Sequence, residues 1–154
     1  MSLKWSDNNT TMVKYLLLCG IFFSIGSLSA QDLALGQWKV HLPYIKAKSV
    51  ATSGDRVYCA SEQGLFYYTK SEGSVTPLSK ITGLSELSVS ATRYNSGFST
   101  LVVAYTNSNI DLIKGNEIIN IPDIKRKNII GDKTIYGISF KGKLAYLSCG
   151  FGIV

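Results

Sequence analysis

An apolar pattern recurs three times along the chain at intervals of 45 and 43 residues. It is centred on three anchor positions: Gly64, Asn109 and Gly152. Apolar or aromatic residues stand five, six and seven positions before each anchor, and Leu65, Ile110 or Ile153 follows it. Repeats of this length usually correspond to one supersecondary unit each, stacked on its neighbours. The period therefore constrains the fold more tightly than the composition does.

Glycine turns between short alternating segments predict a hairpin at the start of each repeat. Gly54 and Gly142 both lie ten residues before their anchors, where a tight hairpin turn needs a positive φ. In the second copy Gly97 lies twelve residues before the anchor, which predicts a loop two residues longer. The strands expected on either side of the first and third turns are 49–53 with 56–61, and 136–140 with 143–148.

Each anchor is expected at the corner between a second and a third strand, because Gly and Asn tolerate a left-handed backbone. Third strands are predicted at 65–68 and 110–113. After the turns "SEGS" and "KGNE", fourth strands follow near 75–78 and 117–121. The second strands of successive units are then 57–61, 101–105 and 144–148.

Four short antiparallel strands per unit at this period are typical of a β-propeller blade. We expect an all-β, incomplete β-propeller of about two and a half blades, at 49–88, 89–134 and 135–154. No helical apolar period occurs after residue 30, which argues against a helical solenoid. Propellers close with about 4–8 blades. The sequence is therefore expected to be the N-terminal fragment of a longer protein, with unpaired apolar edges that disfavour folding alone.

The first thirty residues have the layout of a secretory signal peptide. A lone Lys14 precedes an apolar run over 15–25, and small residues lead to an expected cleavage site after Ala30. Met12 is a second candidate start, and Cys19 lies too deep in the apolar run to suggest a lipoprotein. We expect export to the periplasm or the outer-membrane cell surface, with no transmembrane span in the mature chain.

An entry segment, residues 31–48, does not follow the repeat. Within it Trp38 and Val40 alternate like a strand that Pro43 ends. In many propellers such an N-terminal strand joins the last blade and closes the ring. Residues 36–41 are the candidate for this latch.

The mature chain is mildly basic, which permits attraction to phosphate-bearing surfaces without requiring it. Residues 31–154 hold 14 basic and 9 acidic side chains, a formal charge of +5. The densest positive site is the basic run Lys125-Arg126-Lys127, expected in the connection between the second and third blades. It is either a solvated loop or a contact for an anion.

No catalytic, cofactor-binding or metal-binding constellation is found in the sequence. His41 is the only histidine, and neither GxSxG, HExxH nor a P-loop occurs. Asp111 is expected to be an outward-facing strand residue, with a functional departure from the repeat as the alternative. Cys59 and Cys149 are expected to be unpaired, with a disulfide as the alternative in an exported protein. The aromatic residues are expected mainly in packing, with a rim cluster for a glycan or a peptide left open. We expect no enzyme activity, no cofactor and no nucleic-acid partner.

The sequence resembles two known families. "VYCASEQGLFYY" is similar to the blade motif of two-component-regulator propellers, with Tyr58 at the usual tryptophan position. The longer stretches "GQWKVHLPYIKAKSVATSGDRVYCASEQGLFYYTK" and "NSNIDLIKGNEIINIPDIKRKNIIGDKTIYGISFKGKLAYLSCGFGIV" resemble the N-terminal propeller of the PorZ family. The entry motif W-x-x-H-L-P-Y is the most specific part of this likeness.

The PorZ resemblance implies a surface component of the Bacteroidetes type IX secretion system. Such relatives have two propellers and a C-terminal β-sandwich, and they work in an attachment complex beside a sortase. The implied partners are other protein subunits of that complex and anionic lipopolysaccharide, to which the cargo becomes attached. The resemblance brings no catalytic residues with it.

Two other classes compete with this interpretation. The periplasmic sensor of a hybrid two-component system uses the same blade motif, and a kinase domain after Val154 would favour it. A propeller hydrolase or lyase would need charged residues converging on the axis, and the expected inner strands offer few. The leading hypothesis is a non-enzymatic interaction module.

Overall fold

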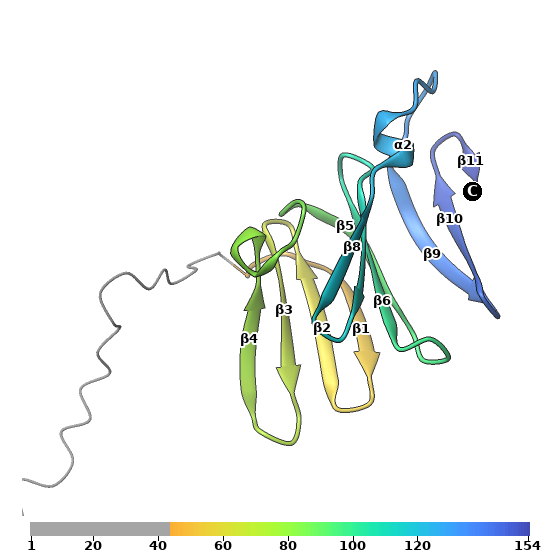
Figure 1. Ribbon diagram of the computed structural model, residues 1–154. Helices are drawn as coiled ribbons and strands as arrows, with labels where there is room; N and C mark the ends of the chain where they lie inside the picture. Colours follow the sequence, from red (N-terminus) through yellow and green to blue (C-terminus); the bar gives the residue numbers. More distant parts are fainter. Residues whose placement is uncertain (1–43) are drawn as a thin grey trace, which may run out of the picture. The chain divides into compact units, whose positions relative to one another are not determined.

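The structure is a computed structural model that describes residues 44–154. The signal peptide and the latch at 36–41 lie outside the described residues and stay predictions. Residues 44–154 form three antiparallel sheets that follow one another in sequence and pack side by side (Figure 1).

Each sheet takes its strands in chain order, as expected of successive propeller blades. The first sheet consists of β1 (Ala47–Ser53), β2 (Arg56–Ser61), β3 (Gly64–Thr69) and β4 (Ser74–Leu78). The second consists of β5 (Val89–Asn95), β6 (Thr100–Tyr105), β7 (Ile110–Lys114) and β8 (Glu117–Ile121). The third consists of β9 (Ile135–Lys141), β10 (Leu144–Cys149) and β11 (Gly152–Ile153).

Two short helices lie in the connections between sheets. The 3-10 helix η1 (Lys80–Thr82) lies between the first and second sheets, and α2 (Asp123–Arg126) between the second and third. The expected second strands at 57–61, 101–105 and 144–148 fall in β2, β6 and β10, each in a different sheet. The repeat inferred from the sequence is therefore a structural repeat, and the fold is that of β-propeller blades in an open array.

The hairpin turns agree with the glycine pattern in two copies and depart from it in one. Gly54 has φ +50° and Gly142 has φ +58°, as the tight turns require. The loop between β5 and β6 is two residues longer than the one between β1 and β2, as predicted. There, however, Ser99 rather than Gly97 takes the positive φ, at +49°.

The anchor prediction holds for backbone geometry only at Gly152, which has φ +134°. Gly64 and Asn109 do not have the left-handed backbone expected of them. Gly64 begins β3 within the ladder and pairs with Ser61, whose hydroxyl donates to the Gly64 carbonyl at 3.1 Å. In the second copy Ser108 has the positive φ, +65°, because the Ser108 amide donates to the Tyr105 carbonyl and closes the turn one residue earlier.

Apolar side chains fill the space between successive sheets in two clusters. The first lies between the first and second sheets and consists of Ala51, Tyr58, Ala60, Leu65, Leu84, Val89, Leu101, Val103, Tyr105 and Ile113. The second lies between the second and third sheets and consists of Ala91, Val102, Ala104, Ile110, Ile124, Ile135, Ile138 and Leu147. Burial of this apolar surface is the main force holding the sheets together.

The first and second sheets approach each other most closely at β1 and β5. There the Ser49 hydroxyl donates to the Thr92 carbonyl at 3.2 Å and accepts from the Thr92 amide at 3.1 Å. The Thr92 hydroxyl also donates to Ser49 Oγ at 3.0 Å. Two small polar side chains thus join the backbones of neighbouring sheets.

The outer faces of the first and third sheets expose apolar side chains. On the first sheet Val50 is 59% exposed, while Tyr44 packs edge-on against Phe66 with ring centroids 4.7 Å apart. On the third sheet Tyr136 and Leu144 are 67% and 61% exposed. These are the faces on which further blades pack in a closed propeller.

Candidate functional site

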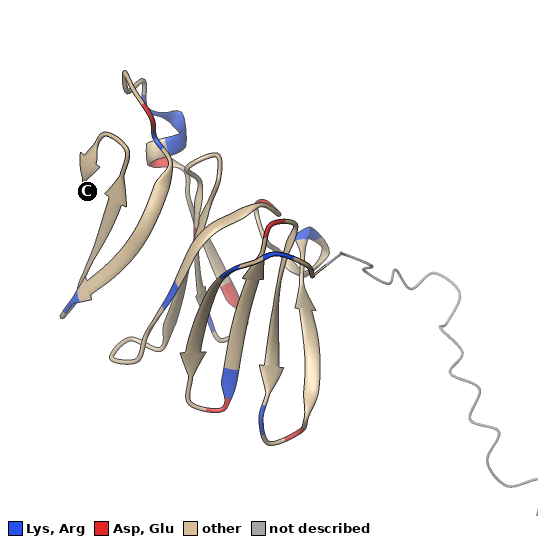
Figure 2. Cartoon of the chain, turned by 180° about the vertical axis from the view of Figure 1, so that it is seen from behind, with Lys and Arg blue, Asp and Glu red and all other residues tan. Residues whose placement is uncertain are grey.

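The basic run lies at α2, in the connection between the second and third sheets, as the sequence predicted. Lys125 and Arg126 form the last turn of this helix, and Lys127 follows in an extended conformation. Buried Ile124 fixes the helix against the second apolar cluster. All three basic residues are exposed. Figure 2 shows the Lys and Arg positions of this helix in blue.

One of the three positive charges is engaged within the protein. Lys125 Nζ lies 2.7 Å from Glu86 Oε1, and Lys80 Nζ lies 3.3 Å from Glu86 Oε2. The hydrogen bond from Lys125 is the main cause that lowers the pKa of Glu86 from 4.5 to about 2. Glu86 therefore links the two inter-sheet connections electrostatically.

The other two charges of the run form a small basic patch with Lys133. Lys133 Nζ donates to the carbonyl oxygens of Lys125 and Lys127, at 2.9 and 3.3 Å. Within residues 44–154, Arg126 and Lys127 lie in none of the ion pairs. Arg126, Lys127 and Lys133 can thus offer N–H donors to a phosphate or carboxylate group.

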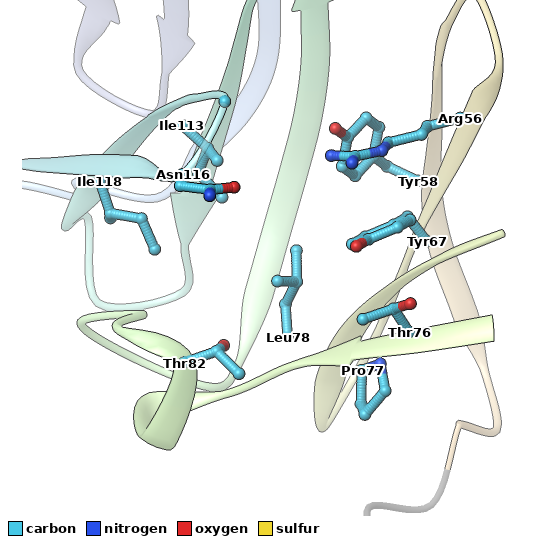
Figure 3. Close-up of a pocket in the computed structure, with 11 residues that line it drawn as sticks. Arg56, Tyr58, Tyr67, Thr76, Pro77, Leu78, Thr82, Ile113, Asn116 and Ile118 are labelled. Carbon is cyan, nitrogen blue, oxygen red and sulfur yellow. The ribbon is translucent and has the colours of Figure 1, made fainter. Parts of the chain in front are cut away.

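A groove opens between the first and second sheets, with a volume of about 250 Å³. One wall carries Arg56, Tyr58 and Tyr67 from β2 and β3 (Figure 3). The opposite wall comes from β7, β8 and their turn, and the floor comes from β4 and η1. The residues of wall and floor are Thr76, Pro77, Leu78, Thr82, Ile113, Gly115, Asn116 and Ile118.

An aromatic cluster with one cation forms the first wall of this groove. The guanidinium carbon of Arg56 lies 4.5 Å from the centroid of the Tyr67 ring, within cation–π distance. The Tyr58 ring lies 5.6 Å from Tyr67 and 6.4 Å from Tyr94, between centroids. From the sequence these tyrosines were predicted mainly in packing, with a rim cluster for a glycan or a peptide left open, and Arg56 was not singled out. The only sequence feature that distinguishes Arg56 is its position as a basic residue at the start of a strand that otherwise shows apolar alternation.

The structure corrects the prediction that the Asp111 side chain faces outward. Asp111 is fully buried, because it lies on the face of β7 that is directed at the first sheet. Its Oδ2 accepts from the Tyr105 hydroxyl at 2.6 Å and from the Ser85 amide at 2.8 Å. Its Oδ1 accepts from Ser85 Oγ at 2.7 Å and Asn120 Nδ2 at 2.8 Å.

Four donors thus satisfy the buried carboxylate, which is the condition for a stable buried charge. Burial, and next the hydrogen bond to Asp111, raise the pKa of Tyr105 above its ordinary value. The network ties Ser85, in the connection from the first sheet, to the second sheet. This geometry indicates a structural role for Asp111, since both of its carboxylate oxygens accept hydrogen bonds from neighbouring groups.

Cys59 and Cys149 are both free thiols, as predicted. Burial raises the pKa of each thiol, which disfavours the reactive thiolate. His41 lies outside the described residues. Over residues 44–154 there is no group of three or more His, Cys, Asp or Glu side chains that could hold a metal ion. Nor does this part of the chain contain a helix long and apolar enough to cross a membrane.

Comparison with solved structures finds a similar chain in PorZ, described as an essential bacterial surface component of the type IX secretion system of Porphyromonas gingivalis. The two share 28% sequence identity, with a TM-score of 0.71 over 77% of this chain. The match covers 16% of the PorZ chain, so this chain spans about a sixth of that protein's length.

Two more distant similarities concern the fold alone. The extracellular domain of the putative hybrid two-component system BT4673 from B. thetaiotaomicron matches 73% of this chain and 15% of its own, at 14% identity and a TM-score of 0.58. A chain of the mitotic checkpoint complex matches 80% of this chain and 39% of its own, at 14% identity and a TM-score of 0.51. No curated protein sequence matches the chain.

The family comparison is more specific than these structural likenesses. Residues 57–154, more than half of the sequence, match the model of the N-terminal β-propeller domain of PorZ in the type IX secretion system. The matched segment begins within β2 and includes the second and third sheets, so it contains both the basic run and the Asp111 network. The chain therefore belongs to the family of PorZ N-terminal β-propeller domains.

Proposed function

We propose that this chain is a non-enzymatic interaction domain of an exported type IX secretion component. In this role it assists the attachment of cargo to anionic lipopolysaccharide at the cell surface, together with other protein subunits. The observation that carries the proposal is the family match over residues 57–154. The signal-peptide layout of residues 1–30 supports export to the periplasm or the outer-membrane surface.

Deletion and complementation of the gene test the proposal. We expect deletion to leave type IX cargo unattached to the cell surface, while cargo of other secretion routes reaches its place normally. Complementation with the wild-type gene should restore attachment. Normal cargo attachment in the deletion strain would contradict the proposed role.

The same strains separate this proposal from the sensor hypothesis. The likeness to BT4673 supports a shared fold only, because the identity is 14%. A sensor would control transcription, so its deletion would change the transcript profile in response to a ligand and leave cargo attachment intact. A secretion component would do the reverse.

The basic patch supports the lipopolysaccharide part of the proposal. Arg126 and Lys127 are exposed and belong to no ion pair within residues 44–154. Each exposed contact with a phosphate or carboxylate group contributes about 0.5–1 kcal/mol, by analogy with surface ion pairs. Lys125 is not expected to contribute, because Glu86 already engages its charge.

We therefore expect the double variant R126S/K127S to bind anionic lipopolysaccharide about 5- to 30-fold more weakly than wild type at low salt. The difference should shrink near 1 M salt, where screening is short-ranged, at about 3 Å. The matched control is K141S/K143S, which removes two exposed lysines at the turn between β9 and β10. Equal binding by the two variants would show that the basic run acts only as a solvated segment.

A further inference from the structure

We infer that the groove between the first and second sheets binds an acidic–hydrophobic segment of a partner protein. In this interaction Arg56 holds a carboxylate of the segment, and the apolar wall opposite holds a neighbouring apolar side chain. This inference goes beyond the secretion role and does not depend on lipopolysaccharide.

The groove presents a single charge. Arg56 is the only charged residue among the eleven that line it. Within the described part of the chain, no Asp or Glu lies at ion-pair distance from Arg56. The adjacent Asp55 is engaged by Ser71, whose amide and hydroxyl donate to its carboxylate at 3.0 and 2.6 Å. Charge complementarity therefore favours an anionic occupant.

Stacking orients the guanidinium for a carboxylate. With its carbon 4.5 Å from the Tyr67 ring centroid, Arg56 has one face covered, while its in-plane N–H donors keep their fork geometry. Figure 3 shows the guanidinium extending along this wall toward the interior of the groove. A carboxylate meets such a fork with two parallel hydrogen bonds.

The residues of the opposite wall and the floor determine which kind of group fits next to the bound carboxylate. Ile113, Ile118 and Leu78 offer aliphatic surface, and Asn116 stands beside them (Figure 3). Arg56 already covers the Tyr67 face on which a sugar ring would stack. A volume near 250 Å³ fits one or two side chains and falls below the usual range of small-molecule pockets. These features favour a peptide segment over a glycan.

The groove is preformed rather than created by its ligand. Its walls belong to two complete four-stranded sheets that share the first apolar cluster. Tyr67, Leu78 and Ile118 pack against that cluster from the groove side. Binding therefore requires little ordering of the protein, which limits the entropic cost of binding.

The test uses two short peptides as probes and NMR titration of the isotope-labelled chain. The acidic probe is acetyl-Leu-Glu-Phe-amide, and its neutral match is acetyl-Leu-Gln-Phe-amide. We expect the acidic peptide to shift the resonances of Arg56, Tyr67 and Ile118, and to bind at least about fivefold more tightly than the neutral one.

The variant R56M keeps the stem over Tyr67 but removes the charge, so it should bind both peptides equally. The control R93M removes an exposed arginine outside the groove and should retain the preference. If R56M disturbs the fold, R56K takes its place. R56K keeps the positive charge but lacks the paired N–H donors of the guanidinium, so it should lower the affinity for the acidic peptide about threefold.

Three outcomes would overturn the inference. The first is equal binding of the two peptides by wild type, which would show that the charge is not used. The second is the absence of any shift at the groove residues. The third is binding of galacturonate, an acidic sugar, without binding of the acidic peptide, which would assign the groove to a glycan.

Discussion

Replacing Asp111 with alanine removes the acceptor of four hydrogen bonds on the first-sheet side of β7. Ser85 Oγ and the exposed Asn120 amide can turn toward water, so the loss of their hydrogen bonds to Asp111 costs little. The Tyr105 hydroxyl and the Ser85 amide cannot do so as easily, because Tyr105 is fully buried and Ser85 N belongs to the backbone. Each buried donor left without an acceptor costs about 1–3 kcal/mol.

Together with the small cavity, these two donors predict that D111A lowers the free energy of unfolding by about 3–5 kcal/mol. This is the usual cost of removing one partner of a buried charge network. For a domain of this size the loss corresponds to a drop in Tm of roughly 10–20 °C. Urea and thermal unfolding followed by far-ultraviolet circular dichroism measure it. The matched control is E117A, which removes an exposed carboxylate at the turn between β7 and β8.

A double-mutant cycle with Y105F tests the mechanism of this loss. In the D111A background the Tyr105 hydroxyl has lost its acceptor, so removing it should cost nothing or restore about 1 kcal/mol. In the wild-type background Y105F should destabilise the protein. A change of less than about 0.5 kcal/mol for D111A, or equal costs of Y105F in both backgrounds, would refute the reasoning.

Two further predictions concern backbone geometry and pH. G54A should lower the free energy of unfolding by about 1 kcal/mol, because an L-residue is strained at φ +50°. G150A should cost more in the same urea titration, because its Cβ would lie 2.6 Å from the Asp132 carbonyl oxygen; an equal or smaller loss would contradict the contact. The folded-state pKa of Glu86 is depressed from 4.5 to about 2, so its ion pairs contribute stability above pH 4.5 that is lost as the pH falls toward 2. E86Q should lower Tm near neutral pH and flatten the fall in Tm over that interval, and a parallel fall in both proteins would argue against this role.

The strands could be predicted from the sequence because their signals are local. Turn glycines, apolar alternation and a nearly constant repeat length together locate β2, β6 and β10 within one or two residues. The predicted left-handed backbone was wrong at Gly64 and Asn109 because several turn types can join the same two strands. Which residue takes the positive φ depends on hydrogen bonds such as that from the Ser108 amide to Tyr105.

The buried role of Asp111 could not be predicted for a different reason. Its donors stand 6, 9 and 26 residues away along the chain, at Tyr105, Asn120 and Ser85. Only the packing of the inter-sheet connection against the second sheet brings them together. A charged residue in a strand is usually predicted to face solvent. No local sequence pattern indicates that Tyr105, Asn120 and Ser85 contact Asp111.

The contact between Ser49 and Thr92 has a geometric consequence for the whole array. The first and second sheets touch through these two small side chains at β1 and β5, and the larger residues of the first apolar cluster fill the space farther from this contact. The space between the first and second sheets therefore has the form of a wedge. Its apex is the contact between Ser49 and Thr92, and the core side chains set its thickness. A bulkier residue at position 49 would move the apex outward and reduce the angle between the sheets. The angle between the first and second sheets thus depends on the side-chain volumes at positions 49 and 92 as well as on those of the core.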